Sequence, residues 1–136
     1  MTDFRHVTDE LSVAPQISAA DVAEAKAQGF VAIICNRPDG EDPGQPTAAE
    51  IAAAAEAAGL TYAHIPVRGA PGPAEVEAMR QAVDAADGPV LAYCRSGTRS
   101  ITTWSIGQAM SGAHERGELV ALGRAAGYDL SGVLGG

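Results

Sequence analysis

The 136-residue chain contains two cysteines, and only 4% of its residues are aromatic. Two cysteines are too few for a disulfide scaffold, and we read no export signal at the start, so a reduced, cytoplasmic setting is expected. No apolar run approaches the roughly 20 residues that cross a bilayer, so we expect no membrane span. With few aromatic rings available, the core has to be packed from small aliphatic side chains.

Positive charge is also scarce. The formal net charge of −8 argues against nucleic acid and against anionic membrane surfaces as partners. Lys26 is the single lysine, and the other eight basic residues are arginines. Four of these stand at or just beyond the ends of expected strands, namely Arg37, Arg68, Arg95 and Arg99. Together they would attract a small anion to one rim, although Arg37 and Arg68 are also explained as solvated loop residues.

Expected helices and strands alternate along the chain. Capping residues and apolar periodicity predict helices at 18–28, 47–58, 73–88, 99–111 and 115–126. Buried strands are expected at 30–35, 60–67 and 90–93, and residues 4–14 supply one or two short edge strands. This alternation indicates an α/β fold with a mostly parallel central sheet flanked by helices. Since no linker interrupts it, residues 1–136 are expected to form a single domain.

The segment that carries chemistry follows the strand at 90–93 and leads into a helix. Its sequence is Cys94-Arg95-Ser96-Gly97-Thr98-Arg99-Ser100. In such a strand, loop and helix arrangement, the loop N–H groups and the positive end of the helix dipole point at one place. A thiolate there is stabilised in its charged form, which is the reactive form. The segment therefore predicts a cysteine nucleophile that acts on an anion.

Each residue of this loop has an expected role. Cys94 is the nucleophile, and Arg99 binds the anion with two parallel N–H groups. Ser100 stabilises Cys94 when it becomes a leaving thiolate. The remaining anion-binding positions are Arg95, Ser96, Gly97 and Thr98. The alternative is that Cys94 is an inert buried thiol at a strand end.

Loops after neighbouring strands are expected beside this segment, because ligands of open α/β sheets bind beyond the carboxyl ends of the strands. Candidates for an outer layer are Arg37, Asp39, Arg68 and Cys35. Asp39 lies in Pro-Asp-Gly and is either a turn residue or a proton donor. Cys35 is either a small core residue or a second thiol that forms a reversible disulfide with Cys94 or resolves a persulfide on it.

Metal and cofactor chemistry is not expected. His6, His64 and His114 are scattered, and neither cysteine has metal-ligand spacing with another ligand.

The cysteine loop resembles those of two enzyme families. Its Cys-x4-Arg spacing is one residue shorter than the Cys-x5-Arg loop of protein tyrosine and dual-specificity phosphatases. Its length and its opening Cys-Arg-Ser-Gly resemble rhodanese-type sulfurtransferases, in which the cysteine carries a persulfide. A shorter loop encloses a smaller cradle, which suits a sulfane sulfur better than a phosphoryl group.

Outside the loop, the helical tail resembles the dual-specificity phosphatases. The whole chain is similar to the phosphatase-like domain of beta-lactamase hydrolase-like proteins. The segments that carry the resemblance are 36–41 (Asn-Arg-Pro-Asp-Gly-Glu), 45–46, 64–67, 94–100 and 126–130 (Ala-Gly-Tyr-Asp-Leu). It implies a three-layer phosphatase-like fold and a role in sulfide or persulfide handling. One departure is that Arg68-Gly69 stands where dual-specificity phosphatases place a general-acid aspartate.

Three functions remain open at this stage. The preferred one is sulfur transfer through a persulfide on Cys94, because a sulfite or thiolate leaving group needs no proton. The alternative is a phosphatase that forms a cysteinyl-phosphate, with Asp39 or water as the acid. The third is a non-catalytic module that binds an anion. The expected substrate is a small anionic sulfur or phosphate compound, a separate persulfide-handling partner enzyme is conceivable, and the oligomeric state is left open.

Overall fold

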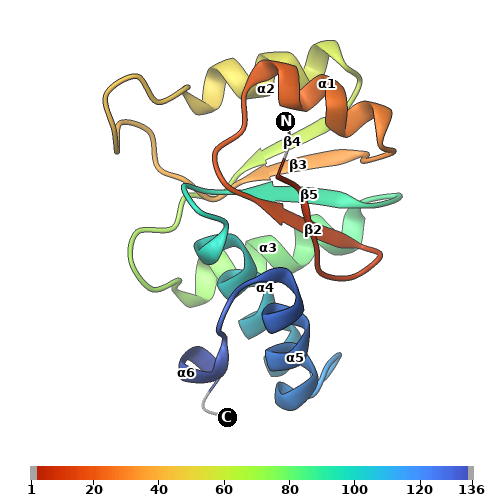
Figure 1. Ribbon diagram of the computed structural model, residues 1–136, viewed down its shortest axis with the longest axis vertical. Helices are drawn as coiled ribbons and strands as arrows, with labels where there is room; N and C mark the ends of the chain where they lie inside the picture. Colours follow the sequence, from red (N-terminus) through yellow and green to blue (C-terminus); the bar gives the residue numbers. More distant parts are fainter. Residues whose placement is uncertain (1–2, 135–136) are drawn as a thin grey trace.

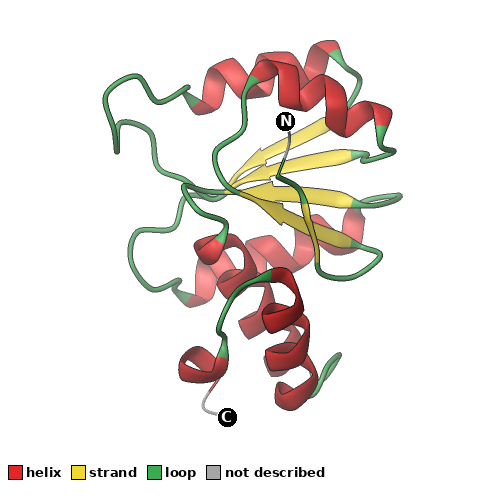
Figure 2. Ribbon diagram, in the orientation of Figure 1, coloured by secondary structure: helices red, strands yellow, loops and turns green. Residues whose placement is uncertain are grey.

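The computed structural model describes residues 3–134, and five strands form its central sheet (Figures 1 and 2). The strands are β1 (Arg5–His6), β2 (Leu11–Ala14), β3 (Ala32–Cys35), β4 (Thr61–His64) and β5 (Val90–Tyr93). Their order is β1-β2-β5-β3-β4. β1 pairs with β2 in the antiparallel sense, and all other neighbours are parallel. The carboxyl ends of four strands therefore meet at one edge.

Helices cover both faces of this sheet. α1 (Ala19–Ala27) and α2 (Ala48–Ala57) lie on one face. The other face carries α3 (Pro73–Ala85), α4 (Thr98–Ser111), α5 (Arg116–Ala126) and α6 (Ser131–Leu134) (Figure 1). The three-layer α/β architecture is thus confirmed. None of the helices within residues 3–134 has the length and hydropathy that a bilayer span requires.

The core consists of two apolar clusters, one on each side of the sheet. Along β5, Val90 and Ala92 belong to the cluster on the α3 and α4 side, whereas Leu91 and Tyr93 belong to the cluster under α1 and α2. Alternate residues of a strand point to opposite faces, so a strand buried on both faces must be apolar throughout. This explains the uninterrupted apolar run that leads to Cys94.

Short-range signals place the starts of α1 and α2 as expected. The Ser18 hydroxyl accepts a hydrogen bond from Asp21 N, and the Asp21 carboxylate accepts one from Ser18 N. Thr47 caps α2 by accepting from Glu50 N. These side chains bind the N–H groups that the first turn leaves unpaired.

The structure corrects three expectations. β2 is not an edge strand, because it lies between β1 and β5 and all four of its residues are buried. β4 ends at His64 instead of residue 67, since Pro66 has no N–H to donate to the ladder. The helix α6 was not expected at all, and one face of it is buried through Leu134.

We predict that replacing Ile101 of α4 by alanine lowers the free energy of unfolding by about 2–5 kcal/mol, because the side chain is fully buried in the core. Urea denaturation would measure the loss. Met110→Ala in the same helix is the matched control: its side chain is 75% exposed, so a change within about 0.5 kcal/mol is expected. Equal losses in both variants would contradict this account of how α4 is attached.

Candidate active site

Cys94 lies directly after β5, at the start of the loop that leads into α4 (Figure 1). Its side chain is buried, and its sulfur accepts a hydrogen bond from Gly97 N at 3.1 Å. Gly97 is the residue before the first turn of α4 and has a φ of +92°, a left-handed conformation that favours glycine. The sulfur thus lies at the positive end of a 14-residue helix.

The peptide unit between Ser96 and Gly97 is bound at both ends. Its N–H donates to the Cys94 sulfur, and its carbonyl oxygen accepts from the Tyr128 hydroxyl at 2.8 Å. Tyr128 is itself buried, and the Arg5 guanidinium lies over its ring, 5.1 Å from the centroid. A side chain at position 97 would collide with the Tyr128 hydroxyl. Tyr128 therefore fixes the direction in which this N–H points.

Arg99 is oriented by two partners outside its helix. Its Nη1 donates to Glu41 Oε2 at 2.8 Å and to the Val67 carbonyl at 2.9 Å, and its Nη2 donates to Glu41 Oε1 at 2.7 Å. Three of its five N–H groups are used in this way, which leaves Nε–H and one Nη2–H for an anion. Hydrogen bonding to Glu41 raises the pKa of Arg99, and the nearby Cys94 thiol adds to the rise.

Arg37 is not a solvated loop residue. Only 3% of it is exposed, and all three of its nitrogens have partners. Nε donates to Glu41 at 3.1 Å, Nη1 to Gln16 at 3.0 Å and Nη2 to Asp42 at 2.6 Å. The solvated interpretation is wrong because the loop 36–46 folds around the guanidinium and supplies the carboxylates that a buried charge requires.

Glu41 and Asp42 connect this buried arginine to the cysteine loop. Glu41 contacts both Arg37 and Arg99, while Asp42 contacts Arg37 and lies 3.5 Å from Nε of Arg95. Hydrogen bonds from Arg99, and then from Arg37, lower the pKa of Glu41 to about 2. Glu41 is therefore ionised at neutral pH and has no proton to give.

The other loop residues lie at the rim or inside α4. Ser96 and Thr98 are exposed, and their hydroxyls are 3.0 Å apart in a hydrogen bond. Arg95 is largely exposed. Ser100 is fully buried, and its hydroxyl has no hydrogen-bond partner among residues 3–134. Residues 94–100 thus form one continuous unit, which consists of the cysteine loop and the first turn of α4.

Two outer candidates, Asp39 and Arg68, form no hydrogen bond or ion pair with the cysteine side chain within residues 3–134. The Asp39 carboxylate accepts from Ala48 N at 2.8 Å, at the start of α2, a contact that differs from both the turn role and the proton-donor role expected for it. Arg68 is exposed and forms no ion pair within the described residues. His64 contacts the Arg37 carbonyl at 3.0 Å. Across residues 3–134, no three His, Cys, Asp or Glu side chains gather as a metal site.

Cys35 lies on the other side of the sheet from the Cys94 sulfur. It pairs in register with Tyr93, and both belong to the cluster under α1 and α2. Since strand residues alternate, Cys94 points toward the α4 side, where Gly97 N contacts it. The Cys35 thiol donates to the Arg37 carbonyl at 3.4 Å, and burial raises its pKa. Both cysteines are free, and this geometry favours the core interpretation of Cys35.

Sequence reasoning did not single out Glu41, Asp42, Gln16 or Tyr128. A signal existed for the first two, because they are acids in a loop expected beside three arginines. Tyr128 lies in the segment 126–130 that carries the family resemblance, but its contact was not expected, because it lies 32 residues after the carbonyl that it binds.

The family model and the curated relatives that match this chain agree on one family. The model of the beta-lactamase hydrolase-like protein, phosphatase-like domain, matches residues 3–111. The chain is 41% identical over 125 residues to a beta-lactamase hydrolase-like protein of Agrobacterium fabrum and 35% identical to one of Xylella fastidiosa. Each alignment covers 91% of this chain but 29% of the relative, so the chain spans less than a third of the length of these proteins.

Solved structures give the same result for the fold. A protein of Neisseria meningitidis, provisionally named a phosphatase, superposes with a TM-score of 0.87 at 35% identity, covering 99% of this chain and 96% of its own. Tk-PTP in its active form gives 0.72 at 19% identity, with 93% and 86% covered. Kinase associated phosphatase gives 0.72 at 15% identity, with 93% and 83% covered. The phosphatase-like fold is thus confirmed.

We predict that Glu41→Gln destabilises the protein in a pH-dependent manner. The folded pKa of Glu41 lies below its ordinary 4.5, so its ion pairs stabilise the fold above pH 4.5, and this contribution is lost as the pH falls from 4.5 to about 2. Thermal unfolding of the wild type and of the Glu41→Gln variant across this range would show a difference in midpoint temperature that narrows below pH 4.5. A gap that stays constant down to pH 2 would contradict the assignment.

We predict that Tyr128→Phe slows the alkylation of Cys94 by iodoacetamide at pH 7 by about three- to tenfold. The physical reason is that the Gly97 N–H is no longer directed at the sulfur. Tyr62→Phe is the matched control, since the Tyr62 hydroxyl contacts that of Tyr93 instead. Equal alkylation rates for the two variants would refute the role of Tyr128.

Proposed function

We propose that this chain, which belongs to the family of phosphatase-like domains of beta-lactamase hydrolase-like proteins, is a thiolate-based enzyme that transfers sulfane sulfur through a persulfide on Cys94. The fold is shared with cysteine-dependent phosphatases, so the choice between sulfur and phosphorus rests on the groups around the sulfur.

The state of the nearby carboxylates carries the proposal. Glu41 is ionised with a pKa of about 2, Asp42 is paired with Arg37, and Asp39 caps α2. Hydrolysis of a phosphate ester gains about 10²–10⁴ in rate from an acid that protonates the leaving oxygen. Sulfite and thiolates leave as anions and need no such acid. Because Glu41 is ionised and the carboxylates of Asp42 and Asp39 are engaged by other partners, these groups favour a sulfur substrate.

The reaction is a displacement at sulfur. The Cys94 thiolate attacks the outer sulfur of a donor such as thiosulfate, the S–S bond of the donor breaks, and sulfite leaves with the electron pair. The persulfide then passes its outer sulfur to an acceptor such as cyanide or a thiolate, and the Cys94 thiolate is regenerated. Charge is conserved in each step and no proton is transferred.

The loop residues supply positive potential for both steps. The free edge of Arg99 binds the donor anion, and Gly97 N–H stabilises the sulfur of Cys94. Arg95 adds charge at the rim, with the N–H groups of Ser96 and Thr98 as further donors. Ser100, buried with an unpaired hydroxyl among the described residues, donates to Cys94 as it leaves in the second step.

A phosphatase that forms a cysteinyl-phosphate is the second candidate. Its support is the fold similarity to solved phosphatases and the length of the match to the Neisseria meningitidis structure. Because Asp39 is bound to the start of α2, water would have to supply the proton. A separate persulfide-handling partner enzyme belongs to the sulfur-transfer proposal alone, and the greater length of the curated relatives leaves room in them for a further domain.

We predict that freshly reduced protein gains one sulfur atom on Cys94 when it is treated with thiosulfate, and that cyanide removes it. Intact-mass measurement would detect the adduct. Cys94→Ala should gain nothing, whereas Cys35→Ala should react as the wild type does, because Cys35 lies on the other face of the sheet. If thiosulfate and glutathione persulfide both leave the mass unchanged while an aryl phosphate is hydrolysed, the phosphatase is the correct function.

A further inference from the structure

An apolar groove of about 430 Å³ adjoins the cysteine loop. Residues 69–71 form one wall, Thr98, Arg99, Thr102 and Ile106 of α4 form another, and Val133 of α6 closes the far side. The volume lies in the range of about 300–1,000 Å³ that is common for small-molecule sites. Thr98 and Arg99 belong both to this groove and to the anion-binding loop, so the two sites are continuous.

The lining is mostly hydrocarbon, from Ala70, Pro71, Ile106 and Val133. Large apolar side chains that remain exposed in residues 3–134 gather here: Val133 is 47% exposed and Met110 is 75% exposed. Met110 lines a smaller hollow of about 130 Å³ that shares Ile106 and Val133 with the groove. Exposed apolar side chains that cluster mark a binding surface more often than those that are scattered singly.

We propose that this groove binds the organic group of the sulfur donor, so that the preferred donor is an anion with a terminal sulfane sulfur and a compact apolar substituent. The inference rests on the proposed function and adds the substrate class to it. Arg99 binds the anionic end at its free edge while the substituent occupies the groove. A benzene-sized group, which fits a cavity of about 150 Å³, is readily accommodated.

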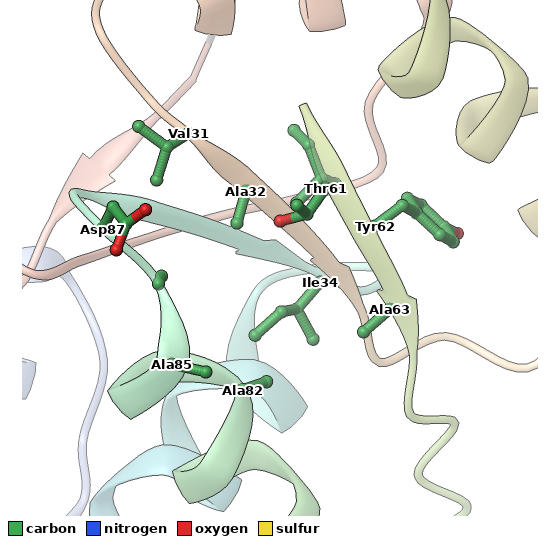
Figure 3. Close-up of a pocket in the computed structure, with 11 residues that line it drawn as sticks. Val31, Ala32, Ile34, Thr61, Tyr62, Ala63, Ala82, Ala85 and Asp87 are labelled. Carbon is green, nitrogen blue, oxygen red and sulfur yellow. The ribbon is translucent and has the colours of Figure 1, made fainter. Parts of the chain in front are cut away.

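A second hollow, of about 320 Å³, supplies a control position for testing the groove. It is lined along β3 and β4, from Val31 and Thr61 at their amino ends to Ile34 and Ala63 (Figure 3). Cys94 follows the carboxyl end of β5, which runs parallel to β3, so Val31 lies toward the opposite end of the sheet from the cysteine loop. Val31 therefore provides a control position outside the groove.

Organic thiosulfonates are the probes that fit this class. In the loading step the Cys94 thiolate attacks the terminal sulfur of R–SO₂–S⁻, the S–S bond of the donor breaks, and R–SO₂⁻ leaves with the electron pair. The products are the Cys94 persulfide and a sulfinate, so atoms and charge balance without an added oxidant, reductant or proton.

The test compares benzenethiosulfonate, methanethiosulfonate and thiosulfate as donors to the reduced protein. Time-resolved intact mass gives the loading rate of Cys94, and each rate is divided by that of the same donor with free glutathione. This division removes differences in intrinsic reactivity. The phenyl donor is expected to load about tenfold faster than the methyl donor, since a few buried carbons suffice for that discrimination.

Val133→Ser is expected to reduce the phenyl-to-methyl ratio by about threefold and to leave loading by thiosulfate unchanged. Val31→Ser, the same substitution in the second hollow, should leave the ratio as in the wild type. A wild-type ratio of about one, or equal slowing of all three donors by Val133→Ser, would overturn the proposal.

Three further outcomes have distinct meanings. If Val133→Ser changes the sedimentation coefficient but not the donor ratio, the groove is a contact between copies of the chain and the proposal is overturned. If none of the three donors loads Cys94 while glutathione persulfide does, this inference is overturned and sulfur transfer stands. If glutathione persulfide does not load Cys94 either, the proposed sulfur transfer fails and this inference fails with it.

Discussion

The buried guanidinium of Arg37 is the constraint on which the geometry of the site depends. A charge removed from water must be fully paired, and Arg37 meets this need with Glu41, Asp42 and Gln16. Each partner has a second contact with the cysteine loop: Glu41 with Arg99, Asp42 with Arg95, and Gln16 through its N–H to the Arg95 carbonyl at 3.3 Å. Three strand ends are thereby fixed around one sulfur.

This pairing also determines which chemistry is available. Glu41, which orients Arg37 and Arg99, is held in its charged form by them, so it positions cations and does not donate a proton. Arg99 keeps one edge of its guanidinium for an incoming anion, and the Gly97 N–H remains on the sulfur. Such a site stabilises negative charge on both the nucleophile and the leaving group, which matches displacement at sulfur more closely than ester hydrolysis.

The scaffold itself does not distinguish the two reactions. This fold is shared with solved phosphatases whose sequences are 15–19% identical to the chain, and a fold alone does not specify a reaction. The differences are local: a loop with four residues between Cys94 and Arg99, and Arg68 exposed after β4 where the resemblance places an acid. Under the proposal above, the apolar groove beside Arg99 selects a substrate by its organic part.

The sequence by itself determined the alternation of strands and helices, the cysteine loop and its place at a helix start. These features depend on residues close together in the chain, such as the Ser18 cap and the glycine at 97. Only the tertiary structure decided that Arg37 is buried, that β2 is an inner strand and that Glu41 and Tyr128 orient the loop. Those contacts join residues up to 58 positions apart, and hydrogen bonds across such separations leave no periodic or local signature in a sequence.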